Sequence, residues 1–153
     1  MPSVIRIQTA DFDLGSEIAQ LRAGRSDVGA VVSFIGTVRD MNAGDAVFGL
    51  RLEHYPGMTE AVLQSLVDQA RARWAIQEVC LIHRVGALRP GAQIVLVITT
   101  AAHRAAAFAA CEFLIDRLKT AAPFWKQEQT PNGPRWVAAR PADSAAADRW
   151  GQS

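Results

Sequence analysis

Apolar residues follow two patterns along this chain, one typical of strands and the other typical of helices. Continuous runs of β-branched and aliphatic residues predict buried strands, whereas apolar residues three and four positions apart predict amphipathic helices. On this basis the first hundred residues contain strands at 4–8, 28–38, 46–55, 76–85 and 93–100 and helices at 14–23 and 59–74. Asp13 stands where a cap for the first helix is expected.

A third helix is predicted to begin at His103 and to end before Pro123, because proline lacks an N–H group and disfavours helix in the residue before it. Its expected buried stripe consists of Phe108, Cys111, Leu114, Ile115 and Leu118. Lys119 lies within about 20° of Phe108 around the helix axis, so we expect it at the edge of that stripe. Arg117 is expected on the opposite, solvated side.

A β-hairpin is predicted after this helix, with strands at 124–128 and 135–139 joined by a Pro-Asn-Gly-Pro turn. The alternation of a strand places Lys126 on the same face as the first and last residues of its strand. Trp125 and Trp136 stand on the two facing strands. Packing is the expected role of their rings, and an aromatic stacking surface is the alternative.

The order of the predicted elements indicates a single domain of the α+β class over residues 1–153. The elements follow one another as β-α-β-β-α-β-β-α-β-β, and a short tail helix is expected near residues 143–150. We expect a mixed or antiparallel sheet with its helices on one face, a polar loop at 39–45, and a peripheral tail at 141–153.

The composition narrows the function classes. Half of the residues are hydrophobic, a fifth are charged and the formal net charge is +1, so we expect a globular chain that does not bind extended nucleic acid. No apolar run approaches the roughly 18 residues that span a membrane, and the N-terminus lacks the apolar region of a signal peptide. Cys80 and Cys111 show no metal-site spacing, so we expect two buried free thiols in a reducing, cytoplasmic setting.

Lysine occurs only at Lys119 and Lys126, whereas the other fourteen of the sixteen basic residues are arginine. Arginine supplies a fixed positive charge, but a desolvated lysine amine can lose its proton near neutral pH and act as a base or a nucleophile. The two lysines are therefore the leading candidates for catalytic groups, although an arginine-rich composition could also leave two lysines by chance.

His103 and Arg104 stand in the first turn of the third helix, where a cation opposes the helix dipole. A bound anion would remove this conflict, and so would an arginine that pairs with a core carboxylate or extends to solvent. Arg104 and Lys119 are fifteen residues apart, or roughly 22 Å along the axis. A small ligand could contact both only if two copies meet with these helices antiparallel, which predicts a homodimer with shared sites.

Other candidate residues carry weaker signals. Arg39 follows a buried strand at the mouth of a loop, a position suited to gripping a phosphate, although a solvated loop arginine is the commoner case. His54 and His83 have no partner at the spacing of metal ligands, so each is expected to be structural. No phosphate-binding loop, dinucleotide fingerprint or zinc-protease sequence is present.

Five segments of the chain resemble one known family. GAVVSFIGTVRD at 29–40, LEHYPGMTE at 52–60, HRVGALRPG at 83–91, AHR at 102–104 and LKTAAPFWKQE at 118–128 are similar to the large, catalytic subunit of molybdopterin synthase, the MoaE family. The most specific of these is the Lys-Thr-x-Ala-Pro-Phe-Trp-Lys run. The resemblance extends from Gly29 to about Arg140.

The resemblance implies a fold, an activity and partners. The fold would be an α/β hammerhead with an added β subdomain. The activity would be a sulfurtransferase that forms the dithiolene of molybdopterin from cyclic pyranopterin monophosphate, with no cofactor or metal in this step. The sulfur would come from the C-terminal Gly-Gly thiocarboxylate of a small ubiquitin-like subunit, and two large subunits would form the core of a heterotetramer.

The resemblance also implies site residues. Lys119 would be the key catalytic residue, with Lys126 beside it. The pterin pocket would be lined by Thr37, Val38, Arg39, His103, Arg104, Lys119, Lys126, Gln127, Glu128 and Arg140. His103 and Arg104 would come from the neighbouring chain. Family members often carry a basic residue where this chain has Gln127, which favours a backbone contact over a side-chain role there.

Two other classes of function fit the same residues. The chain could hold a phosphorylated metabolite or a ubiquitin-like tail without chemistry. It could also be a structural dimer whose lysines form ion pairs with Glu112, Asp116 or Glu128. Retention of both lysines argues against simple binding, and an assay for dithiolene formation separates these classes.

Overall fold

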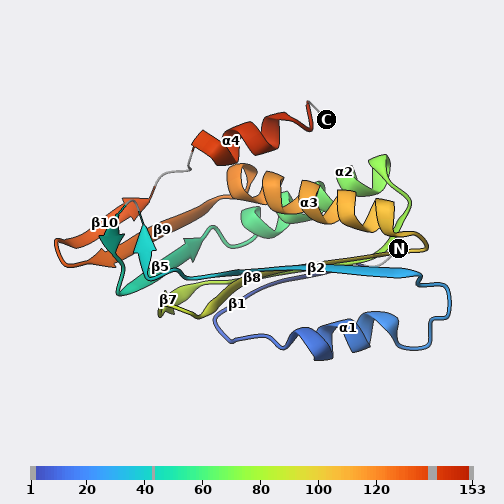
Figure 1. Ribbon diagram of the computed structural model, residues 1–153, viewed down its shortest axis with the longest axis horizontal. Coiled ribbons are helices and arrows are strands. Elements are labelled where there is room, and N and C mark those ends of the chain that lie inside the picture. The colour runs from blue at the N-terminus through green and yellow to red at the C-terminus, as the bar shows by residue number, and fades with distance from the viewer. Residues whose placement is uncertain (1–2, 43, 138–140, 152–153) are drawn as a thin grey trace.

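The computed structural model describes residues 3–42, 44–137 and 141–151. In this part of the chain a four-stranded sheet carries helices on both faces, and a second four-stranded sheet extends from one end (Figure 1). The helices are α1 (Leu14–Arg22), α2 (Met58–Arg73), α3 (Arg104–Ala121) and α4 (Pro141–Asp148). The strands are β1 (Ser3–Gln8), β2 (Ala30–Thr37), β3 (Met41–Asn42), β4 (Asp45–Ala46), β5 (Gly49–His54), β6 (Ile76–Arg84), β7 (Gly86–Leu88), β8 (Gln93–Ala101), β9 (Phe124–Thr130) and β10 (Gly133–Val137).

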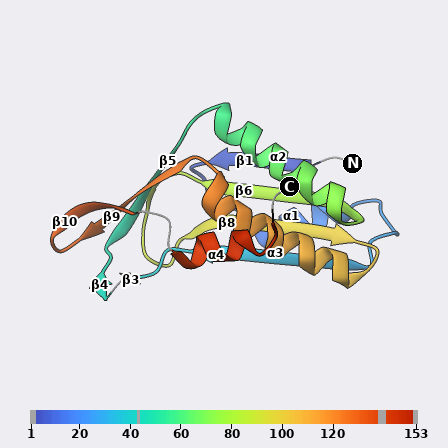
Figure 2. The ribbon, with the colours of Figure 1, turned by 90° about the horizontal axis from the view of Figure 1, so that it is seen from above.

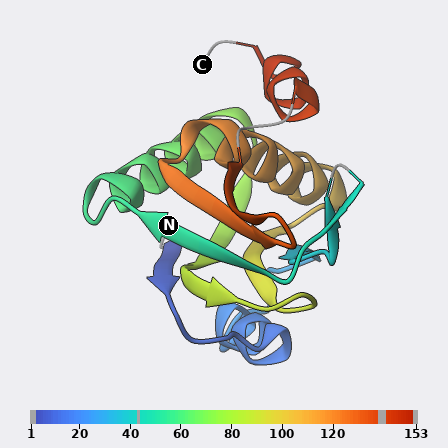
Figure 3. The same cartoon turned by 90° about the vertical axis from the view of Figure 1, so that its left-hand side faces the viewer.

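The first sheet has the strand order β1-β6-β8-β2. β1 and β6 are parallel, whereas β6, β8 and β2 pair antiparallel, so the sheet is mixed, which is one of the two expected alternatives. Successive residues of β6 and β8 are buried, which requires cover on both faces of the sheet. α2 and α3 lie on one face and α1 on the other (Figure 3), so the expectation of helices on one face is wrong.

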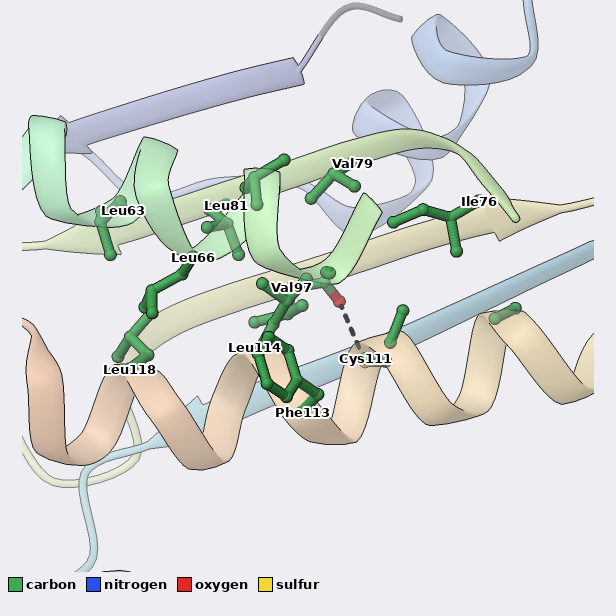
Figure 4. Packing of buried hydrophobic residues seen from close by; sticks show 14 of the residues in the cluster. Leu63, Leu66, Ile76, Val79, Leu81, Val97, Cys111, Phe113, Leu114 and Leu118 are labelled. Atoms are coloured by element: carbon green, nitrogen blue, oxygen red, sulfur yellow. Dashed lines mark hydrogen bonds between the residues drawn. The ribbon is translucent and has the colours of Figure 1, made fainter. Parts of the chain in front are cut away.

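The main core lies between the first sheet and the two long helices. In Figure 4, Leu66 of α2 reaches Leu118 of α3, and Leu63 of α2, Leu114 of α3 and Val97 of β8 belong to the same cluster. A second cluster on the opposite face packs α1 onto the sheet through Phe12, Leu21, Cys80, Ile82, Leu96 and Ile98. No helix in the described part of the chain is long and apolar enough to cross a membrane.

The buried side of α3 differs from the predicted stripe. Phe108 is 61% exposed, whereas Phe113 is fully buried against Trp74 and Trp150 in edge-on ring contacts. Arg117, four residues after Phe113, lies on the same side, with its guanidinium 5.2 Å from that ring. The tail helix α4 packs on α3 and turns this side of it inward. Arg117 is therefore half-buried and donates to the carbonyl of Gly151, which corrects the expectation of a solvated side chain.

The second sheet has the antiparallel order β10-β9-β5-β7, and its β9 and β10 form the predicted hairpin. The strand expected at 46–55 divides into β4 and β5, and the polar segment before it contains the short β3–β4 ladder instead of an open loop. β7 was not predicted, because three residues are too few to show a period. Its pairing with β5 completes the sheet.

The outer face of the second sheet carries exposed aromatic rings. Trp125 is 46% exposed, Trp136 is 64% exposed and Tyr55 is 54% exposed. The packing role expected for the two tryptophans is therefore wrong within this chain. Exposed aromatic rings gathered on one face are typical of a surface that a partner covers.

Candidate active site

A cavity of about 330 Å³ lies where the two sheets meet the C-terminal end of α3. It is lined by Thr37, Val38, Arg39, Met41, Asn42, Val47, Leu50, Ile94, Lys119, Thr120, Ala122, Phe124, Lys126, Glu128 and Val137. The candidate site residues among them come from the end of β2, the last turn of α3 and the first half of β9, which adjoin at the left of Figure 1, and β3, β5, β8 and β10 supply the rest of the wall. Both lysines of the chain thus line one cavity.

The bend between α3 and β9 brings the two lysines together. α3 ends at Ala121, and β9 begins at Phe124, directly after Pro123. The fully buried hydroxyl of Thr59 accepts a hydrogen bond from Tyr55 N–H at 3.0 Å and donates to the carbonyl of Pro123 at 3.2 Å. These bonds attach the start of α2 to the bend and fix the direction in which β9 leaves it.

The two lysines differ in their exposure. Lys126 is half-buried and shares its face of β9 with Phe124 and Glu128, as strand alternation requires. Lys119 is exposed, because the buried side of α3 is turned away from Phe108. The expected position of Lys119 at the edge of a buried stripe beside Phe108 is therefore wrong for the isolated chain, and Lys119 lies at the cavity mouth.

Glu128 is the centre of a hydrogen-bonded network on the cavity wall. Its carboxylate is 6% exposed and accepts from Asn42 Nδ2 at 2.9 Å and from Arg135 Nε at 3.0 Å. Arg39 donates to the Oδ1 of Asn42 at 3.4 Å. Because both oxygens of Glu128 have partners, this carboxylate holds β3 and β10 in place and aligns Arg39.

Sequence reasoning missed Asn42 and Arg135 as parts of this wall. Arg135 stands directly opposite Glu128 in the hairpin register, so the pairing of opposite charges across the predicted turn was the available signal. Asn42 gave no such signal, because it was assigned to an open loop. With Glu128 neutralised by Arg135, the cations Arg39, Lys119 and Lys126 leave the cavity suited to an anion.

The remaining candidate residues lie in three different places. Thr37 and Val38 line the cavity. His103 and Arg104 are exposed at the far end of α3 and are not among the lining residues of this cavity. Gln127 is on the opposite face of β9 from Lys126, so in this chain its side chain does not enter the cavity. Arg140 lies outside the described residues.

The two cysteines are buried and free, as predicted. Burial raises the pKa of Cys80 to about 11 and that of Cys111 to about 12, so both thiols stay protonated at neutral pH and are unsuited to nucleophilic attack. Among the described residues, no group of three or more His, Cys, Asp or Glu side chains is placed to hold a metal ion.

Burial strongly lowers the pKa of the His83 side chain. It is 3% exposed, and burial lowers its pKa from 6.5 to about 4, with further lowering from Lys126, Lys119 and His54. Nδ1 lies 2.8 Å from the carbonyl of Arg84.

We expect His83 to make the fold sensitive to acid. Above pH 6.5 the ring is neutral in both states, so its full contribution is present. Between pH 6.5 and about 4 only the unfolded chain binds the proton, so the free energy of unfolding falls with pH by about 3 kcal/mol in total. Urea titrations at pH 7 and pH 4.5 measure this loss, and it should be smaller by most of that amount in His83→Gln. An equal loss in both proteins would contradict the assignment.

The sequence and the fold of the chain are similar to those of known proteins. The family model described as MoaE protein matches residues 7–121. The molybdopterin synthase catalytic subunit of Ralstonia nicotianae is 61% identical over 151 residues, which cover 99% of this chain and 85% of that protein. The molybdopterin biosynthesis MoaE protein of Burkholderia ambifaria superposes with a TM-score of 0.84 at 54% identity, covering 99% of this chain and 100% of the other. The structure of molybdopterin synthase from Staphylococcus aureus superposes with a TM-score of 0.79 at 28% identity, covering 86% and 95%.

Proposed function

The chain belongs to the MoaE family, and from this premise we propose that it is the catalytic subunit of a molybdopterin synthase. It transfers sulfur from the C-terminal thiocarboxylate of a small ubiquitin-like subunit to cyclic pyranopterin monophosphate and so forms the dithiolene of molybdopterin. The observation that carries this proposal is that Lys119 and Lys126, the two lysines of the chain, line one cavity with Arg39. In this proposal the first sheet and its helices are the hammerhead, and the second sheet is the added subdomain. Two buried free thiols fit a reducing cytoplasm.

The charge of the cavity fits the substrate. A cyclic phosphate is an anion, and Arg39 is the cavity arginine that its bond to Asn42 orients. Lys126, on the inner face of β9, lies deeper in the cavity than the exposed Lys119. The phosphate therefore binds against Arg39, and the pterin side chain extends toward the two amines.

The sulfur transfer requires attack on the pterin side chain, loss of oxygen as water and opening of the cyclic phosphate. Lys119 lies at the mouth, where the tail of the small subunit must enter, so the incoming tail and the substrate desolvate its amine. Once desolvated, that amine moves protons between the thiocarboxylate and the departing oxygen. Lys126 stabilises negative charge as it develops on the substrate.

Two copies of the chain complete each site, with His103 and Arg104 supplied by the neighbour. β2 is the strand through which the two copies would pair, and we call this contact the seam. It is an eight-residue, largely apolar strand at an edge of the first sheet, and in the described structure β8 is the strand that pairs with it (Figure 2). A long apolar edge strand is a ready template for pairing with another chain.

The dimensions of α3 and β2 fit this seam. α3 packs over β8 and β2, so pairing of two β2 strands at about 4.8 Å sets the two α3 axes about 10 Å apart, a normal helix packing distance. β2 runs in the same direction as α3, with Ala30 beside the helix start and Thr37 beside the cavity. Antiparallel pairing of β2 therefore brings Arg104 of one chain to the Lys119 end of the other.

We expect Ser33→Cys to cross-link this dimer. Ser33 is exposed near the middle of β2, so the two copies of this residue lie at or beside the two-fold axis. Non-reducing gels should show a disulfide-linked dimer for Ser33→Cys and none for the control Ser65→Cys, which places a thiol on the exposed side of α2. An enzyme that sediments as a dimer without cross-linking at position 33 would place the seam elsewhere.

The test of the activity is reconstitution. The purified chain is mixed with a thiocarboxylated small subunit and cyclic pyranopterin monophosphate, and dithiolene is measured. Formation of dithiolene that depends on all three components supports the proposal. Tight binding of both partners without product would instead favour a simple binding module.

A further inference from the structure

His83 lies directly beneath the proposed catalytic cavity, and the mechanism above does not use it. It is the last inward-facing residue of β6 before the strand ends at Arg84. Its ring stacks on Phe124, with centroids 3.8 Å apart and planes 18° from parallel. Phe124 begins the strand that carries Lys126 two residues later on the same face. The histidine ring therefore supports this end of β9 by packing against its first residue.

The hydrogen bond of Nδ1 fixes which ring nitrogen carries the proton. Nδ1 lies 2.8 Å from the carbonyl oxygen of Arg84, and a carbonyl oxygen only accepts, so Nδ1–H is the donor. Burial keeps the ring neutral, since it lowers the pKa of His83 to about 4. Nε2 is then an unprotonated acceptor on the opposite side of the ring.

A small second cavity of about 80 Å³ connects this ring with the site. Its lining includes His83 together with Thr37, Lys119, Phe124 and Lys126, and the last four of these also line the larger cavity. This space exceeds the roughly 10–15 Å³ that one water molecule needs, and its walls offer polar partners, so it can hold water. An amine at the edge of the site can therefore be linked to the ring beneath it.

We propose that His83 is a positioning residue for Lys126, with Nε2 accepting a hydrogen bond from the lysine amine through water in this small cavity. The catalytic importance of this contact rests on the proposed function, whereas the hydrogen bond between His83 and Lys126 can be tested without it. Lys126 lines the small cavity with His83 and lies two residues after Phe124, on which the His83 ring stacks, whereas Lys119 reaches the same cavity from α3. This placement favours Lys126 as the partner.

A neutral acceptor in this place has a chemical use. A lysine side chain is long and flexible, and it holds one orientation only where a fixed acceptor selects that orientation. Because His83 resists protonation, it can accept from the ammonium group without becoming a competing cation. The charge of Lys126 is thereby kept at the cavity wall that the substrate contacts.

Nitrogen NMR of the ¹⁵N-histidine-labelled protein tests the geometry without any assay of activity. At pH 7 the His83 ring should show a protonated Nδ1 and an unprotonated Nε2. The Nε2 resonance should move in Lys126→Ala and stay in place in Lys119→Ala. A protonated Nε2, or an Nε2 that responds only to Lys119→Ala, would overturn the proposal.

Kinetics of two substitutions test the role. His83→Phe retains a ring to stack on Phe124 but has no acceptor, and we expect kcat to fall about tenfold with KM changed less than twofold. His83→Gln places an amide oxygen near the Nε2 position and should recover most of the loss. Equal kcat in all three proteins, or a loss that glutamine does not restore, would overturn the positioning role. Absence of dithiolene formation in the wild-type protein would overturn the proposed function and leave the NMR result standing.

Discussion

Replacement of Lys119 by alanine should abolish dithiolene formation while the fold and the binding of the small subunit persist. The side chain is exposed at the cavity mouth, so its removal leaves no hole in the core, and the free energy of unfolding should change by less than about 0.5 kcal/mol. Loss of a proton-transfer group, in contrast, lowers kcat by about 10²- to 10⁴-fold. Single-turnover formation of dithiolene with a thiocarboxylated partner measures the effect.

Two further variants separate the possible causes of that loss. Lys119→Arg keeps the positive charge but cannot release a proton at neutral pH, so it should be nearly as inactive as the alanine variant if the amine moves protons. Arg89→Ala removes an exposed cation that does not line this cavity and should keep wild-type turnover. Near-full turnover by Lys119→Ala would show that the catalytic assignment is wrong.

Local patterns in the sequence predicted several elements around the cavity correctly. The helix before Pro123, the face that Lys126 shares with Phe124 and Glu128, and the cap at Asp13, which accepts from Ser16 N–H at 2.9 Å, are all as predicted. These features depend on neighbours within a few residues, such as a missing N–H group or a period of two. The continuous apolar runs predicted β6 and β8 as buried strands, but the expectation of helices on one face overlooked that such strands need cover on both faces.

Features that depend on distant segments were not predictable in this way. Phe113 is buried and Phe108 exposed because α4, which follows almost thirty residues later, adds a second contact surface to α3. Lys119 is likewise exposed in the described structure, because the buried side of α3 is not the predicted one. Likewise, the hydrogen bond to the Glu128 carboxylate could not be predicted, because its donor, Asn42, is 86 residues away in the sequence. Single-chain periodicity carries no information about such contacts.

Mixed dimers provide the sharpest expected result on the shared site. Arg104→Ala should lower activity by about 10- to 100-fold, because a charge-assisted contact to the phosphate is lost, and Lys119→Ala should be inactive. The two defects are on different chains of each proposed site. A dimer that contains one chain of each variant therefore has one site with both native groups and one site with neither.

Differently tagged variants, co-expressed and purified through both tags, yield this mixed dimer alone. Its activity should rise to about half that of the wild-type dimer, since half of its sites are intact. The two variant homodimers, purified in the same way, are the matched controls. If Arg104 served the site of its own chain, every site in the mixed dimer would carry one defect and no activity would return. Recovery thus depends on the roughly 22 Å between the two residues along α3, a length that one small substrate cannot span within a single chain.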